Sequence, residues 1–301
     1  MITENYQVEL RHFTYFLTVA EELHFRKASE KLFISQPGLS NQIKQMEELL
    51  GVQLFVRDKK KVALTQAGKY LKQEVDFVLS HLKKVKKQVK LIGDGSLGEV
   101  RIGFLGSAMQ SVIPNLLLTL QAEQPNIHTS LEELSNRAQI NLLLKGELDL
   151  GFVRLGHVPN SLESKPVFED TFSLVLPVDA ELEDSNFKGM HQVANQSFIL
   201  FSKEYSPLYF DTVMSICKDS GFQPYVSHKS VHAQTIFRLV ENGLGIAIVP
   251  TSLKHGFQLG VKFIELKKIP QRAVLSVVWN RDNRNPVLHH CLNSLSKGLF
   301  H

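Results

Sequence analysis

The chain has 301 residues, carries 34 Lys and Arg against 30 Asp and Glu, and is 43% hydrophobic. This length and composition predict two domains, or one large one, with sizeable cores. No stretch approaches the roughly 20 consecutive apolar residues that cross a membrane, the N-terminus lacks the pattern of a signal peptide, and two cysteines are too few for a disulfide framework. We therefore expect a cytoplasmic protein that does not associate with membranes.

Basic charge is concentrated in the first third of the chain. Residues 1–93 hold 16 Lys and Arg against 10 Asp and Glu, a net charge of +6, whereas the remaining residues hold 18 against 20. A basic segment beside a neutral one is the distribution expected of a nucleic-acid-binding part joined to a regulatory part. The neutral remainder argues against general binding to membranes or polyanions.

The stretch from Phe25 to Gly51 predicts two helices joined by a tight turn. The first should end near Phe33. Ser35 is then a good N-cap, and Pro37 falls in the first turn of the next helix, where its missing N–H costs no intrahelical bond. Gly51 is placed to end the second helix in a left-handed conformation. The apolar residues of the second helix recur every three or four positions: Leu39, Ile43, Met46, Leu49 and Leu50.

The opposite face of the second helix is polar. It carries hydroxyl, amide and lysine side chains: Gln36, Ser40, Asn41, Gln42, Lys44 and Gln45. At the N-terminal end of a helix, such groups can reach base edges and phosphates in a major groove. The pattern predicts a helix-turn-helix whose second helix is the recognition helix. For this pattern alone, an ordinary amphipathic helical hairpin is the alternative.

A basic hairpin follows. Gln53–Arg57 and Lys61–Thr65 alternate like short strands and are separated by Asp58-Lys59-Lys60. A two-stranded wing of this kind would lie against the sugar-phosphate backbone beside the recognition helix. We predict phosphate contacts for its basic residues, Arg57, Lys59, Lys60 and Lys61.

Residues Val8 to Leu71 resemble the winged helix-turn-helix of LysR-type transcriptional regulators. The matching residues are Leu10-Arg11-His12-Phe13, Tyr15-Phe16, Ala20-Glu21-Glu22-Leu23-His24-Phe25, Ala28, Leu32, Ile34-Ser35-Gln36-Pro37, Leu39-Ser40, Gln42-Ile43, Glu47-Glu48, Leu50-Gly51, Leu54-Phe55-Val56-Arg57 and Leu64-Thr65-Gln66-Ala67-Gly68. Gly38 stands where the family usually has a small helix former, and Asn41 where an arginine is frequent. The second departure removes a cationic side chain, so it bears on base preference. The residues expected to contact operator DNA are Arg26, Ser35, Gln36, Pro37, Ser40, Asn41, Lys44, Arg57, Lys59, Lys60 and Lys61.

From about Thr65 to Ile92 the pattern predicts one long helix. Thr65 is a plausible N-cap, and apolar residues recur at near-heptad spacing. Such a stripe needs a partner helix, and the resemblance implies pairing with a second copy of the chain in a homodimer or homotetramer. The lysines of its second half are expected to form a solvated face, with distal phosphate contact as the alternative: Lys83, Lys84, Lys86, Lys87 and Lys90.

The segment Gly93 to Gly98 matches the dinucleotide-binding pattern Gly-x-Gly-x-x-Gly. That motif must follow a strand and open a helix, whereas here a helix precedes and a strand follows. We therefore interpret the segment as a hinge and exclude a nucleotide site.

From Glu99 onward, predicted strands and helices alternate. The strands are Val100–Leu105, Ile127–Leu134, Leu148–Val153, Thr171–Leu176, Ser197–Phe201, a short one near Val226, Gly245–Val249 and Ala273–Trp279. The helices run from Gly106-Ser107 to about Gln124, and over Ala138–Lys145, Pro207–Ser220, His232–Asn242 and from Pro286 onward. This order implies a parallel sheet with right-handed crossovers, to which the last strand returns.

Two α/β lobes linked by crossing strands resemble the periplasmic-binding-protein-like effector domain of the same family. Leu148–Phe152 and Val240–Pro250 resemble its usual signatures. We thus predict an α/β protein with a winged helix-turn-helix at residues 1–66, a linker and dimerisation helix at 67–93, and an effector domain at 94–301. The lobes of that domain are expected at about 99–170 plus 268–301, and at 171–267.

The effector site is expected where strands end and helices begin, because ligands bind outside the carboxyl ends of parallel strands and helix N-termini attract anions. The predicted contacts are Ser107, Asn136, Arg154, Ser202, Tyr205 and His232. For the serines and the asparagine the alternative is simple N-capping, and for Arg154 and His232 an internal salt bridge or polar contact. A small organic or aromatic acid is the expected effector.

The sequence as a whole predicts a LysR-type transcriptional regulator that binds double-stranded operator DNA and responds to a small-molecule effector. Contact with the transcription machinery is compatible with this prediction. We expect no enzymatic activity, cofactor or metal: His289-His290-Cys291 lacks the spacing of a metal site. Cys217 and Cys291 could form a redox sensor, but they fall in different predicted lobes. Two other classes remain open, an interaction module or scavenger that does not bind DNA, and an enzyme that turns over its ligand between the lobes.

Overall fold

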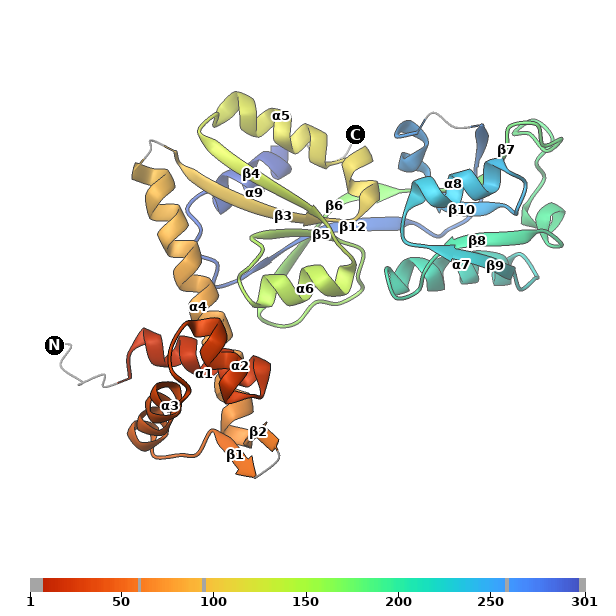
Figure 1. Cartoon of the computed structure of the whole chain (residues 1–301). Coiled ribbons are helices and arrows are strands. Elements are labelled where there is room, and N and C mark those ends of the chain that lie inside the picture. Colours follow the sequence, from red (N-terminus) through yellow and green to blue (C-terminus); the bar gives the residue numbers. More distant parts are fainter. Residues whose placement is uncertain (1–7, 59–60, 94–95, 258–259, 298–301) are drawn as a thin grey trace. The chain divides into compact units, whose positions relative to one another are not determined.

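A computed structural model of the chain describes residues 8–58, 61–93, 96–257 and 260–297 (Figure 1). Its contacts divide the chain into two compact units, Met1–Lys87 and Gln88–His301. In the part that the structure describes, no helix combines the length and the apolar character needed to cross a membrane.

The first unit consists of three helices, a two-stranded wing and most of a long helix. Its elements are α1 (Leu10–Glu22), α2 (Phe25–Leu32), α3 (Gln36–Leu50), β1 (Phe55–Asp58), β2 (Lys61–Leu64) and α4 (Gln66–Gly93), whose last turns belong to the second unit. β1 and β2 pair antiparallel. The predicted helix pair, wing and long helix are therefore confirmed.

Helix α3 begins and ends where its sequence signals place it. The Ser35 Oγ accepts a hydrogen bond from the Gly38 N–H at 3.2 Å, and Pro37 lies in the first turn. Gly51 ends the helix with a φ of +67°, a conformation that costs glycine little. The buried face of α3 packs into the core of the unit through Leu39, Ile43 and Met46, together with Phe16, Val19, Ala28, Leu54, Phe55 and Val75.

The base of the wing is tied to α3 by one carboxylate. The Glu47 Oε1 accepts hydrogen bonds from the backbone N–H groups of Leu54 at 2.8 Å and Phe55 at 3.0 Å. Thr65, which follows β2 at the same base, donates through its Oγ1 to the Gln53 carbonyl oxygen at 2.8 Å and accepts from the Gly68 N–H at 2.9 Å, which confirms the predicted N-cap of α4. The base of the wing is therefore held by Glu47 of α3 and by the N-cap residue of α4.

The first lobe of the second unit is built on a five-stranded sheet in the order β4-β3-β5-β12-β6. Its elements are β3 (Gly98–Phe104), α5 (Ile113–Glu123), β4 (Ile127–Glu133), α6 (Asn136–Leu144), β5 (Leu150–Val153), β6 (Leu162–Asp170), β12 (Ala273–Asn280) and α9 (Leu288–Lys297). β4, β3 and β5 are parallel, and β12 returns to this sheet, as predicted; it pairs antiparallel with β5 and β6, which was not predicted. α5 and α9 pack against one another on one face, and α6 covers the other (Figure 1).

The second lobe lies between β6 and β12 in the sequence. It contains β7 (Phe172–Pro177), β8 (Ser197–Phe201), α7 (Pro207–Asp219), β9 (Tyr225–Ser230), α8 (Ala233–Glu241), β10 (Ala247–Pro250) and β11 (Val261–Glu265). The strands form a sheet in the order β10-β7-β11 and a parallel pair β8-β9. Three short 3-10 helices complete the second unit: η1 (Gly106–Gln110), η2 (Met190–Val193) and η3 (Thr251–His255). The chain crosses between the lobes once from β6 to β7 and once from β11 to β12.

The structure corrects one sequence-based expectation and contains two strands that the sequence analysis did not predict. The single helix predicted to run to Gln124 is a 3-10 turn followed by α5, because Pro114 fits the first turn of a new helix but not a helix interior. Strand β6 was not predicted because Pro166 interrupts it; Pro is tolerated there because β6 is an edge strand whose register with β12 shifts at this point. The short edge strand β11 was not predicted either.

We predict that Gly68→Ala destabilises the first unit and that Gly93→Ala, in the same helix, does not. A Cβ on Gly68 would lie 2.2 Å from the Leu54 backbone oxygen, whereas a Cβ on Gly93 would meet nothing within 4 Å. The expected loss for Gly68→Ala is about 1–3 kcal/mol of unfolding free energy, as for other overpacked sites. Hydrogen exchange of the α3 amides in the whole chain measures it, and equal protection in the two variants would contradict the prediction.

Candidate functional site

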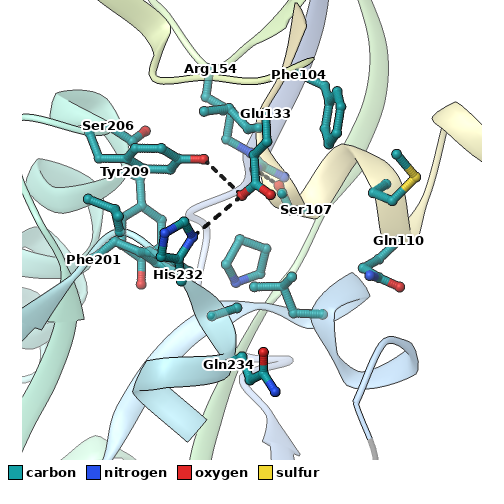
Figure 2. Close-up of a pocket in the computed structure, with 18 of the residues that line it drawn as sticks. Phe104, Ser107, Gln110, Glu133, Arg154, Phe201, Ser206, Tyr209, His232 and Gln234 are labelled. Atoms are coloured by element: carbon teal, nitrogen blue, oxygen red, sulfur yellow. Dashed lines mark hydrogen bonds and ion pairs between the residues drawn. The ribbon is translucent and has the colours of Figure 1, made fainter. Parts of the chain in front are cut away.

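A cavity of about 280 Å³ lies between the two lobes of the second unit (Figure 2). The first lobe contributes the end of β3, η1 and the residues at the ends of β4 and β5. The second lobe contributes the starts of α7 and α8 and part of η3. The polar lining residues are Ser107, Gln110, Glu133, Arg154, Tyr205, Ser206, Tyr209, His232 and Gln234, and the larger apolar ones are Phe104, Leu105, Met109, Phe201, Val231, Leu253 and Phe257. The volume lies just below the range for small-molecule sites, ~300–1,000 Å³, so it suits a small ligand.

Arg154, which follows β5, places a buried cation on the cavity wall. The residue is 5% exposed. Its Nη1 donates a hydrogen bond to the Ser107 Oγ, while Nε and Nη2 have no hydrogen-bond partner among the described residues. Burial lowers the pKa of Arg154, and the negative charge of Asp170 opposes that shift. Because a guanidinium stays protonated in proteins and a buried charge needs a partner, an anionic group in the cavity would complete this site.

Two helix N-termini add positive potential to the same cavity. α7 begins directly after the lining residue Ser206, and α8 directly after the lining residue His232. Neither of these side chains caps its helix. The free N–H groups and the dipole of a helix N-terminus favour anions. The two helix N-termini of the second lobe therefore add to the preference for anions that Arg154 creates in the first lobe.

Glu133, the last residue of β4, brings a carboxylate to the same space. Its Oε1 lies 3.5 Å from the Tyr205 hydroxyl and 4.0 Å from the His232 Nδ1, so it faces two groups of the other lobe. Figure 2 shows its contact with His232. Burial, together with the charge of Glu133, raises the pKa of Tyr205 to about 12, so this phenol is protonated at neutral pH. A Cβ on Gly106 would lie 2.8 Å from the Glu133 Oε1. Glycine at position 106 thus leaves room for the carboxylate.

Of the six effector contacts predicted from sequence, four line the cavity: Ser107, Arg154, Tyr205 and His232. Asn136 and Ser202 are not among the lining residues. Asn136 is 2% exposed; its Oδ1 accepts from the Arg154 backbone N–H at 3.0 Å and its Nδ2 donates to the Ser206 Oγ at 3.1 Å. The Ser202 Oγ accepts from the Tyr205 N–H at 3.3 Å, a local capping contact. Asn136 therefore joins the two lobes through polar groups beside the cavity.

Sequence analysis missed several lining residues. Glu133 ends a strand that had been predicted, so the rule that ligands lie at strand ends could have found it. Gln110 was not predicted as a lining residue because η1 and α5 were predicted as one helix. Tyr209 lies inside α7, and its hydroxyl donates to the Ile248 carbonyl oxygen. No signal in the sequence places Tyr209 or Gln234 beside Arg154, because these contacts depend on how the lobes meet.

In the first unit, the predicted DNA contacts whose side chains the structure describes lie on α2, on α3 and at the N-cap of α3. Gln36, Pro37, Asn41 and Lys44 are exposed on α3, and Ser40 is partly exposed. Ser35 caps the helix, the Lys44 Nζ lies 3.6 Å from Glu48, and Arg26 on α2 pairs with Glu30 at 3.2 Å. Arg57 and Lys61 belong to β1 and β2, but their side chains lie outside the description, and Lys59 and Lys60 lie outside the described residues.

Two family models match the chain. One, described as "Bacterial regulatory helix-turn-helix protein, lysR family", covers residues 10–69, and the other, "LysR substrate binding domain", covers residues 93–299. The chain is 31% identical to the HTH-type transcriptional regulator AlsR of Bacillus subtilis over 95% of each chain. It is also 31% identical to the HTH-type transcriptional regulator BenM of Acinetobacter baylyi over 86% of each chain.

Solved structures agree with these matches. Full-length BenM superposes with a TM-score of 0.59 at 26% identity and covers 96% of each chain. Full-length CbnR in complex with its target DNA has a TM-score of 0.75, covers 96% of this chain and 99% of that one, and at 21% identity shows the shared fold alone. The chain therefore belongs to the LysR family, as a DNA-binding transcriptional regulator with a C-terminal effector-binding domain.

Both cysteines lie in hydrophobic cores. Cys217 on α7 is buried in the second lobe and Cys291 on α9 in the first, and both are free thiols. Burial raises the pKa of each thiol to about 12. Redox-sensing cysteines are instead accessible and have a low pKa. Among the described residues, no three His, Cys, Asp or Glu side chains gather as they would around a metal ion.

We predict that neither thiol reacts with Ellman's reagent at pH 8 while the chain is folded. Because the pKa of each thiol is raised to about 12, the reactive thiolate form is suppressed at every pH below that value, and burial blocks access as well. After unfolding in guanidinium chloride, two thiols per chain should react at once. Rapid reaction of either thiol in the folded chain would restore the redox-sensor alternative.

Proposed function

We propose that this regulator binds operator DNA under the control of a small organic or aromatic acid held between the lobes of its effector domain. The observation that carries the proposal is the buried guanidinium of Arg154, whose Nε and Nη2 have no partner in the described chain. A carboxylate can accept two parallel hydrogen bonds from a guanidinium. The apolar part of such an acid fits the aromatic and aliphatic remainder of the lining.

The proposed effector contacts are those that border this cavity, and Asn136 acts as a link between them. Its side chain joins the Arg154 backbone N–H of one lobe to the Ser206 hydroxyl of the other. An acid that binds Arg154 more tightly in one arrangement of the lobes stabilises that arrangement by its difference in affinity. We propose that this shift changes the arrangement of subunits and so the bend or spacing of the DNA they bind.

The proposed oligomer is a homodimer or homotetramer assembled partly through α4. Large apolar side chains remain exposed along this helix in the single chain: Tyr70, Phe77, Val78, Val85, Val89 and Ile92. Tyr70 is 66% exposed and Val89 65%, fractions that a second copy of the helix would reduce. Two chains would present two recognition helices to a two-fold-related operator in the cytoplasm.

The proposed DNA surface comprises the predicted contacts on α2, α3 and the wing. We predict that Ser40→Ala combined with Lys44→Ala abolishes specific binding to DNA from the promoter region nearest the gene. The wild type should bind in the nanomolar range with a steep salt dependence, and loss of the Lys44 phosphate contact should reduce the salt slope by about 1. Fluorescence anisotropy over a salt series measures both, with Lys218→Ala in the effector domain as control. Equal binding of the double variant and the wild type would contradict the assignment of α3.

We predict that Arg154→Gln weakens binding of carboxylic acids to the effector domain and leaves DNA binding without effector intact. Loss of charge-assisted hydrogen bonds should weaken a bound acid by about 10- to 100-fold. Calorimetric titration of the whole chain with benzoate measures the change. The matched control is Arg137→Gln, because Arg137 is exposed on α6 outside the cavity. If Arg154→Gln binds benzoate as the wild type does, the acid does not bind at this guanidinium.

A further inference from the structure

We infer that the effector carries a hydrogen-bond donor besides its acidic group, as a hydroxy acid or an amino acid does, and that Glu133 recognises this donor. The inference rests on the proposed function, since it concerns the same cavity. It is carried by a feature that binding of a simple acid does not explain, namely a carboxylate on the wall of a cavity that otherwise favours anions.

Glu133 is incompletely bound by its neighbours. The Tyr205 hydroxyl, at 3.5 Å from Oε1, is at the limit of a hydrogen bond, and the His232 Nδ1, at 4.0 Å, is at the limit of an ion pair. Within the described chain, Oε2 has no hydrogen-bond donor, and the Glu133 side chain is 43% exposed, so water supplies its remaining hydrogen bonds. A polar group of a ligand can replace such a water when it reproduces the hydrogen bonds of that water. A donor group of a ligand could occupy the space between Glu133 and the second lobe.

The two charged groups of the cavity do not neutralise one another. Glu133 and Arg154 both line the cavity, yet no ion pair joins these two described side chains. A ligand with a carboxylate alone would satisfy Arg154 but would add a second negative charge beside Glu133. A ligand that also has a hydroxyl or ammonium group would satisfy both, because a carboxylate accepts strongly from such donors.

The backbone nearby accommodates the carboxylate. A Cβ at position 106 would lie 2.8 Å from the Glu133 Oε1, so a larger residue there would displace the Glu133 side chain. Figure 2 shows this carboxylate turned toward His232, on the side of the cavity formed by the second lobe. Position 106 thus lets an acidic side chain remain at the cavity wall, where it can select among acids.

The test compares acids that differ by one donor group. The probes are benzoate, meta-hydroxybenzoate and meta-(aminomethyl)benzoate, and as an aliphatic series butyrate, beta-hydroxybutyrate and beta-aminobutyrate. Each is titrated calorimetrically into the whole chain, its Glu133→Gln variant and its Glu132→Gln variant. Glu132 is the matched control, because it precedes Glu133 on β4 and does not line the cavity. Circular dichroism confirms that each variant is folded.

In at least one series, we expect the hydroxy and ammonium acids to bind the wild type and Glu132→Gln at least about tenfold more tightly than the parent acid. Glu133→Gln should lose the advantage of the ammonium acid and keep much of that of the hydroxy acid, because an amide oxygen still accepts a hydrogen bond but carries no charge. The inference is wrong if the parent acid binds as tightly as both derivatives, or if Glu133→Gln keeps the ammonium preference. If no acid binds, or if Arg154→Gln binds all of them unchanged, the proposed function itself fails, and the inference fails with it.

Discussion

The effector domain depends on a cation that the fold buries without fully satisfying it. The Arg154 guanidinium makes one hydrogen bond, to Ser107, and is attracted by the more distant charge of Asp170, while two of its nitrogens lack partners among the described residues. Removing such a group from water is costly unless an opposite charge accompanies it. The lobes are connected by two crossing segments, and Arg154 lies where they face each other. In the function proposed above, this buried charge would attract an anionic effector, and a change in the position of Arg154 would alter the contact between the lobes.

Asn136 shows how this response can be transmitted. Its side chain bonds to the backbone of Arg154 in one lobe and to the residue before α7 in the other. Buried polar networks of this kind are sensitive to small displacements, because each broken bond leaves a buried polar atom unpaired. A shift of Arg154 toward a ligand would therefore change the hydrogen bond between Asn136 and Ser206 at the start of α7, without any large movement of the sheet.

The first unit could be predicted from sequence more completely than the second because its determinants are local. Ser35, Pro37 and Gly51 lie within or next to the helix that they delimit, and Thr65 caps the helix that follows it. In the effector domain, the core strands and the return of β12 followed from apolar patterns. Strand β6 did not, because it is an edge strand interrupted by Pro166. The cavity depends on contacts between distant residues: Arg154 meets Ser107 47 positions away, and Asn136 meets Ser206 70 positions away. Such pairs follow from how two lobes meet, which no local pattern encodes.

The carboxylate of Glu47 has a consequence for how regulators of this kind can diverge. It binds two successive N–H groups at the base of the wing from within α3, so the geometry of the recognition helix and that of the wing are set together. The three residues of this anchorage, Glu47, Leu54 and Phe55, all precede the turn between β1 and β2 in the sequence. Substitutions later in the hairpin leave these three residues unchanged, so descendants of one ancestor can differ there while all of them inherit the same placement of α3 against the base of the wing.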